Sequence, residues 1–290
     1  MLNQFSCGEA PTLRKANKRR GEMDERTVDV TAAMTETYDH YFSSDEYRLR
    51  YPVPNYATLE YVMARGAGAG ANILDFGCGN GRYGLALLER TQARITGYDI
   101  SRASLDEFES VLQRTPHRDR VTLIHGELEN LDQEKPHDVV LMLFGVLSHI
   151  GIRAKRIAAL RKIRSLITPN GKLILSVPSI YRRRPIELLK FWVWRRLGLA
   201  RAPHNEPGNI FFSRAIDGKP VVFFYHLYSI SRLREELAQS GFKMSDCAPE
   251  SFLPEWLVTQ SSLARRLDNL VLRILPASLG YCIRVTADPV

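Results

Sequence analysis

The residues with the clearest capacity for chemistry are an acid and the glycine-rich bend that follows it. Asp75 lies near the end of a short apolar run and precedes Gly77-Cys78-Gly79-Asn80-Gly81. Glycines allow a sharp turn and let a ligand touch the backbone, and the start of a following helix offers free N–H groups. A carboxylate at this place would repel a pyrophosphate and would attract an ammonium group. The GxGxG spacing also differs from the GxGxxG of dinucleotide-binding turns.

A second acid, Asp99, ends the next predicted strand, 94–98. An acidic side chain at this place can accept two hydrogen bonds from the hydroxyls of a ribose. The bend and its two carboxylates therefore predict a nucleoside ligand that carries a positive charge rather than a diphosphate.

The elements that must position these residues are strands that alternate with helices. Alternation at this spacing indicates βαβ units and a parallel sheet. Short apolar runs predict strands at 72–76, 94–98, 121–125, 138–144, 172–177, 243–247 and 281–287. Helices are predicted from about residue 31 and over 55–65, 83–91, 104–113, 153–167, 231–240 and 263–275.

The regular alternation breaks after Pro178, and this break suggests four segments. Residues 1–30 are predicted to be a basic tail without packed structure, and 31–178 the nucleoside-binding core. Residues 179–222 are rich in Arg, Pro, Gly and aromatic residues and are interpreted as an insertion that caps the acceptor site. Residues 223–290 complete the core with its last two strands.

These motifs together resemble the class I, Rossmann-like S-adenosylmethionine-dependent methyltransferase superfamily. The glycine bend with Asp75 and Asp99 resembles the superfamily's first motif and the acid that follows it. The runs Gly126-Glu127-Leu128, 137–150 and Leu166-Ile-Thr-Pro-Asn-Gly-Lys-Leu-Ile-Leu175 resemble the loop after strand three, strand four with its loop, and strand five. The resemblance implies an α/β fold with a mostly parallel seven-stranded sheet and helices on both faces, to which the composition of residues 179–222 adds a basic, aromatic-rich cap.

The resemblance also implies which residues hold the cofactor, S-adenosylmethionine. Glu127 stands where the superfamily usually has Asp, in the loop that meets the adenine. Tyr38 lies in the N-terminal segment that covers the cofactor. Arg48 or Arg50 could hold the methionine carboxylate, and the alternative for both arginines is a solvated position at the surface. The full predicted set is Asp75, Gly77, Gly79, Gly81, Asp99, Ile100, Glu127, Leu128, Phe144 and Tyr38.

Two histidines are candidate catalytic residues. His149 follows the fourth strand, at the sheet edge where ligands bind, and His226 precedes the helix predicted at 231–240. Methyl transfer needs a general base only if the nucleophile is protonated, so each histidine also has a structural interpretation, in packing or hydrogen bonding.

The composition restricts the cellular compartment, the metal sites and the partners that we expect for this protein. The four cysteines are scattered without a CxxC pair, which indicates reduced thiols and no metal site. The absence of an apolar N-terminal region or long apolar run favours a cytoplasmic protein. A net charge of +8 favours anionic partners such as nucleic acid or an acidic membrane surface, or serves solubility.

The sequence does not decide which class of molecule accepts the methyl group. Residues 180–201 contain seven Lys or Arg and one acid, with Trp192 and Trp194 beside arginines. This composition suits a packed cap helix, a peripheral contact with an anionic membrane, or stacking on RNA bases. We predict that the methyl group is transferred to an oxygen or nitrogen atom of a small or lipid-like acceptor. One alternative is a transfer RNA acceptor, because residues 37–52, the GCGNG bend and Tyr225-His226-Leu-Tyr228 resemble the wobble-uridine carboxyl methyltransferases. Another alternative is that the chain is a non-catalytic, cofactor-binding partner subunit.

Overall fold

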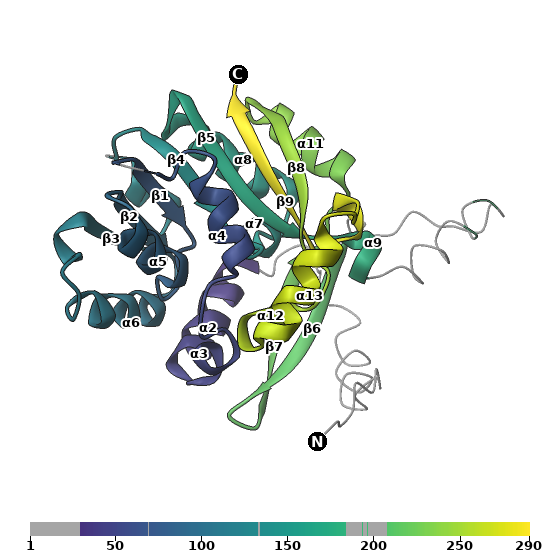
Figure 1. Ribbon diagram of the computed structural model, residues 1–290, viewed down its shortest axis with the longest axis horizontal. Helices are drawn as coiled ribbons and strands as arrows, with labels where there is room; N and C mark the ends of the chain where they lie inside the picture. The colour runs from purple at the N-terminus through teal and green to yellow at the C-terminus, as the bar shows by residue number, and fades with distance from the viewer. Residues whose placement is uncertain (1–29, 69, 133, 184–192, 194–195, 197–207) are drawn as a thin grey trace, which may run out of the picture.

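The computed structural model describes residues 30–68, 70–132, 134–183, 193, 196 and 208–290 (Figure 1). The predicted tail, residues 1–30, and Trp192 and Trp194 of the predicted cap therefore lie outside the described residues, except for Val30.

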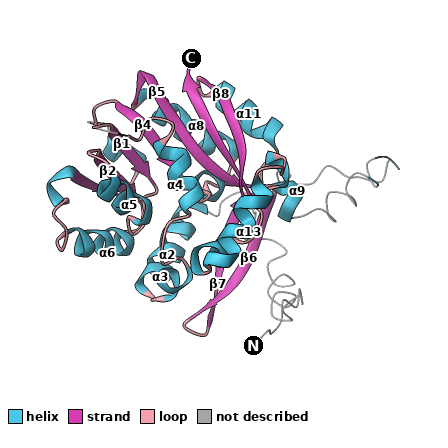
Figure 2. Ribbon diagram, viewed as in Figure 1, coloured by secondary structure: helices cyan, strands magenta, loops and turns pink. Residues whose placement is uncertain are grey.

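One seven-stranded sheet forms the centre of the molecule (Figures 1 and 2). The strands lie in the order β3-β2-β1-β4-β5-β9-β8. Their bounds are β1 (Asn72–Phe76), β2 (Arg94–Asp99), β3 (Val121–His125), β4 (His137–Met142), β5 (Ile167–Pro178), β8 (Phe242–Ser251) and β9 (Cys282–Pro289). The pairs among β1 to β5 are parallel, and β9 is antiparallel to both of its neighbours.

Helices cover both faces of this sheet and bury two separate apolar layers. One face packs against α4 (Tyr56–Met63), α5 (Arg82–Arg90) and α6 (Arg102–Leu112). The other packs against α8 (Arg153–Ser165) and α11 (Ile230–Gln239). Ile73 and Leu74 of β1 are both fully buried, but in different layers. Because both faces of such a strand are buried, nearly all of its residues are apolar, and the resulting continuous apolar run makes the strand recognisable in the sequence.

Serine caps fix where several of these helices begin. The Ser101 hydroxyl accepts from the N–H of Ser104 at the start of α6, and Ser229 accepts from Arg232 at the start of α11. Each such bond satisfies one of the free N–H groups of the first turn. The predicted strands and helices are all present, with bounds that differ by a few residues.

A further layer covers the edge of the sheet where the parallel strands end. It contains α2 (Val30–Ser43), α3 (Glu46–Arg50), the hairpin of β6 (Asn209–Ile216) and β7 (Lys219–His226), and α12 (Glu255–Gln260). The rings of Tyr41, Tyr47, Tyr51 and Phe223 form a third buried cluster between α2, α3 and the hairpin. The remaining short elements are α7 (Val146–His149), α9 (Ile180–Arg183), α13 (Ser262–Leu272), η1 (Arg118–Arg120), η2 (Leu128–Leu131) and η3 (Ala277–Leu279).

The β6–β7 hairpin corrects the predicted segment boundary at residues 222 and 223, which falls inside β7. The insertion leaves the core at Pro178 and returns to the same place, because the Tyr228 N–H donates to the Pro178 carbonyl at 2.9 Å. The chain therefore leaves the core after β5 and rejoins it before α11, and His226 belongs to the described part of this segment.

No helix in the described ranges is long and apolar enough to cross a bilayer.

Candidate active site

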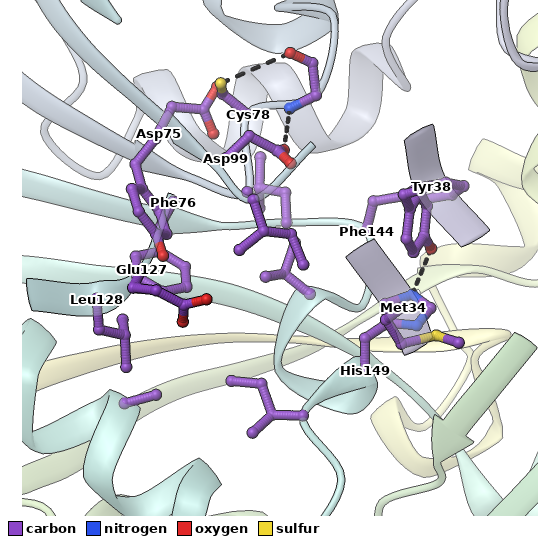
Figure 3. A pocket seen from close by; sticks show the side chains of 18 of the residues that line it. Met34, Tyr38, Asp75, Phe76, Cys78, Asp99, Glu127, Leu128, Phe144 and His149 are labelled. Atoms are coloured by element: carbon purple, nitrogen blue, oxygen red, sulfur yellow. Dashed lines mark hydrogen bonds between the residues drawn. The ribbon is translucent and has the colours of Figure 1, made fainter. Parts of the chain in front are cut away.

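A cavity of about 380 Å³ lies at the carboxyl ends of β1, β2 and β4 (Figure 3). Because β1 and β4 are the strands at which the sheet order reverses, this is the place where open α/β sheets bind ligands. Asp75 and Asp99 lie at one end of the cavity, and Tyr38 and His149 lie at the other (Figure 3).

The glycine bend forms one wall of the cavity through its backbone. Gly77 and Gly79 adopt φ values of 78° and 56°, in the left-handed region. A Cβ atom on Gly77 would lie 2.5 Å from Val146, so no side chain fits there. Gly81 does not line the cavity; it begins α5, and a Cβ atom there would lie 2.2 Å from Phe108.

Asp75 places a buried carboxylate beside this bend. Its Oδ2 is buried and has no hydrogen-bond partner among the described residues. Burial first, and the neighbouring Asp99 second, raise the pKa of Asp75 to about 7. A buried carboxylate without a partner is unfavourable, so this position suits a cationic ligand group such as an ammonium.

Asp99 is oriented by the backbone that surrounds it. Its Oδ2 accepts from the Gly79 N–H at 2.8 Å and its Oδ1 accepts from the Ser101 N–H at 2.9 Å. Burial raises the pKa of Asp99, although these N–H donors favour the ionised form. The remaining acceptor sites of the carboxylate suit ribose hydroxyls.

The loop after β3 lines the next part of the wall. Ile100, Glu127 and Leu128, three of the predicted cofactor-binding residues, all line the cavity. Glu127 is exposed, and the Tyr98 hydroxyl donates to the Gly126 carbonyl at 2.8 Å, which positions the turn before it.

The opposite end of the cavity is aromatic and holds one histidine. The Nδ1–H of His149 donates to the Phe224 carbonyl at 2.9 Å. Nε2 therefore accepts the Tyr38 hydroxyl hydrogen, at 2.7 Å. Burial chiefly lowers the pKa of His149 to about 3, and burial raises that of Tyr38. The pair is neutral near pH 7.

Phe144 separates this cavity from a second one. It is the residue after Leu143 beyond β4, and its φ of 59° is in the left-handed region, which is uncommon for a bulky side chain. The Phe144 N–H donates to Ser176 Oγ at 2.8 Å, which holds the turn in place. Phe144 lines both cavities.

The structure does not bring His226 or Arg48 to the site. His226 is fully buried, and its Nδ1 lies 2.7 Å from Asn209 Oδ1. Arg48 is exposed and pairs with Asp45 at 2.7 Å. Neither lines either of the two cavities, and Arg50 lines only the second one.

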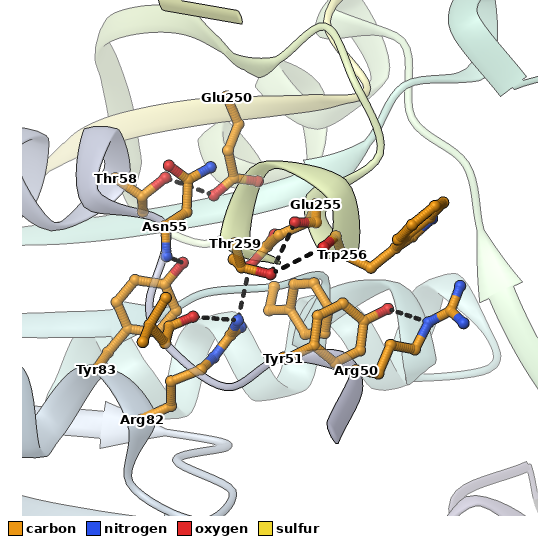
Figure 4. A network of polar contacts seen from close by, with 12 residues as sticks. Arg50, Tyr51, Asn55, Thr58, Arg82, Tyr83, Glu250, Glu255, Trp256 and Thr259 are labelled. Atoms are coloured by element: carbon orange, nitrogen blue, oxygen red, sulfur yellow. Dashed lines mark hydrogen bonds and ion pairs between the residues drawn. The ribbon is translucent and has the colours of Figure 1, made fainter. Parts of the chain in front are cut away.

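The sequence interpretation missed Arg82, which lines the main cavity. Its Nη1 lies 3.0 Å from Glu255 Oε1 of α12, and both side chains are almost fully buried (Figure 4). The position of Arg82 directly after Gly81 was the available signal, but its partner is distant in the chain. Met34, Phe42 and Tyr47 of the N-terminal helices line the cavity too and were not named.

Within the described part of the chain, no group of three or more His, Cys, Asp or Glu side chains could hold a metal ion.

Comparison with known proteins agrees with this geometry. Residues 74–173 match the family model "Methyltransferase domain". The chain is 34% identical over 108 residues to the ribosomal protein L11 methyltransferase of Shewanella amazonensis, covering 37% of this chain and 34% of that one. It is 30% identical over 109 residues to the tRNA U34 carboxymethyltransferase of Idiomarina loihiensis, covering 37% and 32%. The chain thus spans about a third of the length of these curated relatives.

A solved structure shows the same fold over nearly the whole chain. It is the 1,6-didemethyltoxoflavin-N1-methyltransferase of Burkholderia thailandensis, with a TM-score of 0.56, 19% identity and 92% of each chain covered. The family match shows a methyltransferase domain over residues 74–173, and the sheet order and this likeness show a class I, Rossmann-like fold. The methyltransferase domain and the fold predicted from the sequence are confirmed.

Proposed function

We propose that this protein transfers a methyl group from S-adenosylmethionine to an oxygen or nitrogen atom of a small or lipid-like acceptor. The observation that supports the proposal most directly is the buried Asp75 carboxylate beside the Gly77–Gly79 bend and Asp99, because its Oδ2 has no hydrogen-bond partner among the described residues. The cavity combines a carboxylate that can bind a cation, a wall of backbone atoms and a second carboxylate that can accept hydrogen bonds from ribose hydroxyls. This combination fits a positively charged nucleoside.

Each part of the cavity would hold one part of the cofactor. Asp75 would bind the methionine ammonium, Asp99 the ribose hydroxyls, and the Glu127–Leu128 turn the adenine. The cofactor supplies an electrophilic methyl group on its sulfonium. The chain supplies orientation and a site shielded from water, which lower the barrier of an in-line displacement.

Tyr38 and His149 would position the acceptor rather than remove its proton. A pKa of about 3 makes the His149 imidazole a weak base, and its Nε2 lone pair is already used by Tyr38. An acceptor that reacts through a neutral amine or an ionised oxygen needs no base from the protein.

Binding of S-adenosylhomocysteine tests the cofactor assignment. We expect micromolar-range binding by calorimetry, lost in Asp99→Ala and weakened about 10- to 100-fold in Asp99→Asn, which keeps one acceptor oxygen. Asp119→Asn, which removes the same charge at an exposed position in η1 outside both cavities, is the matched control. Failure of the wild-type protein to bind the nucleoside would overturn the proposal.

A transfer RNA acceptor is a second candidate, favoured by the likeness to the tRNA U34 carboxymethyltransferase and by the net charge of +8. It predicts RNA binding that weakens steeply with salt. Incubation of the protein with methyl-labelled cofactor and fractionated cell extract distinguishes the two, because the label enters either RNA or the small-molecule and lipid fractions. Transfer by the lone chain would also exclude a non-catalytic subunit.

A further inference from the structure

A second, smaller cavity lies on the other side of Phe144 from the cofactor cavity. Phe144 and Gly145 after β4 and Pro178 at the end of β5 form its floor. Tyr225 of β7 also lines it and packs against His149, with ring centroids 4.4 Å apart. The two cavities are therefore neighbours at the same edge of the sheet, and a ligand of the second lies next to the reacting end of the first.

The charges around this cavity are strongly unbalanced. Arg50 of α3, Arg183 of α9 and Arg214 of β6 line it, and none of them pairs with a carboxylate in the described ranges. The one acid in the lining, Glu255, lies 3.0 Å from Arg82 and is neutralised by it. Three guanidinium charges thus face the cavity without a counter-charge.

The guanidinium groups are held by aromatic rings, and their N–H edges are only partly bonded: Arg50 Nε donates to the Tyr51 hydroxyl at 3.2 Å and Arg214 Nη1 to the Tyr41 hydroxyl at 3.4 Å. Arg183 lies over the ring of Tyr281 at 4.1 Å from its centroid, and Arg50 lies over Trp256 at 5.7 Å. Stacking uses the flat face of the group, whereas its donors lie in the plane and match a carboxylate or phosphate. The Nε of Arg183 is buried and has no hydrogen-bond partner among the described residues. Such a donor is costly unless a ligand completes it.

The size of the cavity, about 30 Å³, fits one small anionic group. A single water needs roughly 10–15 Å³ on this measure, so the space matches a carboxylate or a phosphoryl group and not a whole acceptor. The remainder of the molecule would extend past Phe144 toward the cofactor cavity.

We propose that the methyl acceptor is an organic anion whose carboxylate or phosphate group is bound by Arg50, Arg183 and Arg214 in this second cavity. This inference rests on the proposed function, because it places the reacting atom of the acceptor on the cofactor side of Phe144. It narrows the small-molecule class to anions and assigns the recognition to three residues from separate elements.

Binding of benzoate, phenyl phosphate and benzyl alcohol to the protein saturated with S-adenosylhomocysteine tests this inference by calorimetry. We expect at least one of the two anions to bind about 10-fold or more tightly than the neutral alcohol, since a charge-assisted hydrogen bond is worth about that much. Benzoate alone would indicate a carboxylate acceptor, and phenyl phosphate alone a phosphate acceptor. Equal binding of all three probes, or binding of none, would overturn the inference.

Two variants test the arginines independently. Arg183→Met and Arg214→Met should each weaken anion binding by about 10-fold or more. Arg182→Met removes the same charge one residue away, at an exposed position outside the lining, and should leave anion binding unchanged. Unchanged binding in both cavity variants would refute the assignment, and if one variant does not fold the other still decides. Binding of S-adenosylhomocysteine is measured in every variant, so that a failure of the cofactor assignment is recognised separately.

Discussion

Asp75 combines a cost to folding with a proposed role in binding. Its folded-state pKa of about 7 lies far above the usual 3.8 of an aspartate. The folded protein therefore holds a proton on this group, between about pH 4 and pH 7, that the unfolded chain has released. By linkage, the free energy of unfolding contributed by this group falls as the pH rises through that window.

We predict that Asp75→Asn raises stability and lowers cofactor affinity. The amide has the same shape without the buried charge, so the variant should unfold at higher urea concentration than the wild type at pH 8 and show a smaller difference at pH 4. Its affinity for S-adenosylhomocysteine should fall by about 10- to 100-fold with the loss of a charged partner. Urea titrations at both pH values and calorimetry measure the two effects. Equal stability at pH 8 would contradict the role of burial.

The Tyr38–His149 hydrogen bond leads to a prediction about protonation. Because burial lowers the pKa of His149 to about 3, its ring should stay neutral from pH 8 down to pH 5. The ring-proton NMR shift of His149, assigned by comparison with His149→Gln, should therefore remain constant while free imidazole in the same tube titrates. A shift change centred near pH 6.5 would show that the ring is accessible as a base.

Local spacing in the sequence predicted many of the residues that line the main cavity. Asp75, the glycines and Asp99 follow apolar runs directly, and the strand-end rule places such residues at one edge. Arg82 was missed because the feature that makes it notable, the buried contact with Glu255, joins segments far apart in the chain. His226 was assigned to the site because it precedes the helix predicted at 231–240, but it is a buried residue of β7 whose ring lies against Asn209 of β6 instead.

At the scale of elements, the sheet was easier to predict than the layer that covers its edge. β6 alternates between exposed and partly buried residues and lacks the continuous apolar pattern of the core strands, although residues 221–225 of β7 do have that pattern. A signal was nevertheless present at Asp217-Gly218, whose φ values of 49° and 73° form the tight two-residue turn between β6 and β7. An Asp-Gly pair between two runs of β-forming residues is typical of such hairpins.

The junction of α8 and α11 depends on a fully buried ion pair. Arg156 and Glu236 have no exposed surface, and they meet through two hydrogen bonds of 3.1 and 2.8 Å. The Tyr228 hydroxyl also donates to Glu236, at 2.8 Å, and so ties the end of the insertion to this junction.

We predict that breaking this pair is costly and that replacing both members costs less than the sum. Arg156→Met should lower the free energy of unfolding by about 3–5 kcal/mol, because it leaves a buried carboxylate without its partner. Arg156→Met with Glu236→Leu should recover part of that loss. Chemical denaturation of the two single variants and the double variant measures the coupling. Strict additivity would mean that the two charges do not interact.

At the scale of the whole molecule, the structure leaves an apolar stripe in solvent. Leu263, Leu267 and Leu270 of α13 are 66%, 54% and 61% exposed, and Ile274 just beyond the helix is 86% exposed. They recur at helical spacing on one face, while Ala264 and Asp268 face the protein. Arg266 and Arg273 are exposed on the same helix and the turn that follows it.

This arrangement extends the sequence-based prediction of a peripheral membrane contact to described residues. Apolar side chains beside arginines bind anionic lipid surfaces, so the protein should float with phosphatidylserine vesicles and not with phosphatidylcholine vesicles. Leu267→Glu combined with Ile274→Glu should abolish flotation. Leu49→Glu, at another exposed leucine, serves as the control. Flotation that persists in the double variant would rule out this surface.

The position of α2 links the start of the described chain to whatever occupies the main cavity. On one side Asp39 accepts from the Ser101 hydroxyl at 2.6 Å, and on the other the Thr37 hydroxyl donates to the Val222 carbonyl at 3.2 Å. Met34 and Tyr38 of the same helix form part of the cavity wall. A nucleoside that contacts this wall adds to the free energy that keeps the helix docked, because ligand binding stabilises the conformation that it contacts. Saturation with the nucleoside should accordingly slow amide hydrogen exchange throughout α2, more than in the far strands β8 and β9.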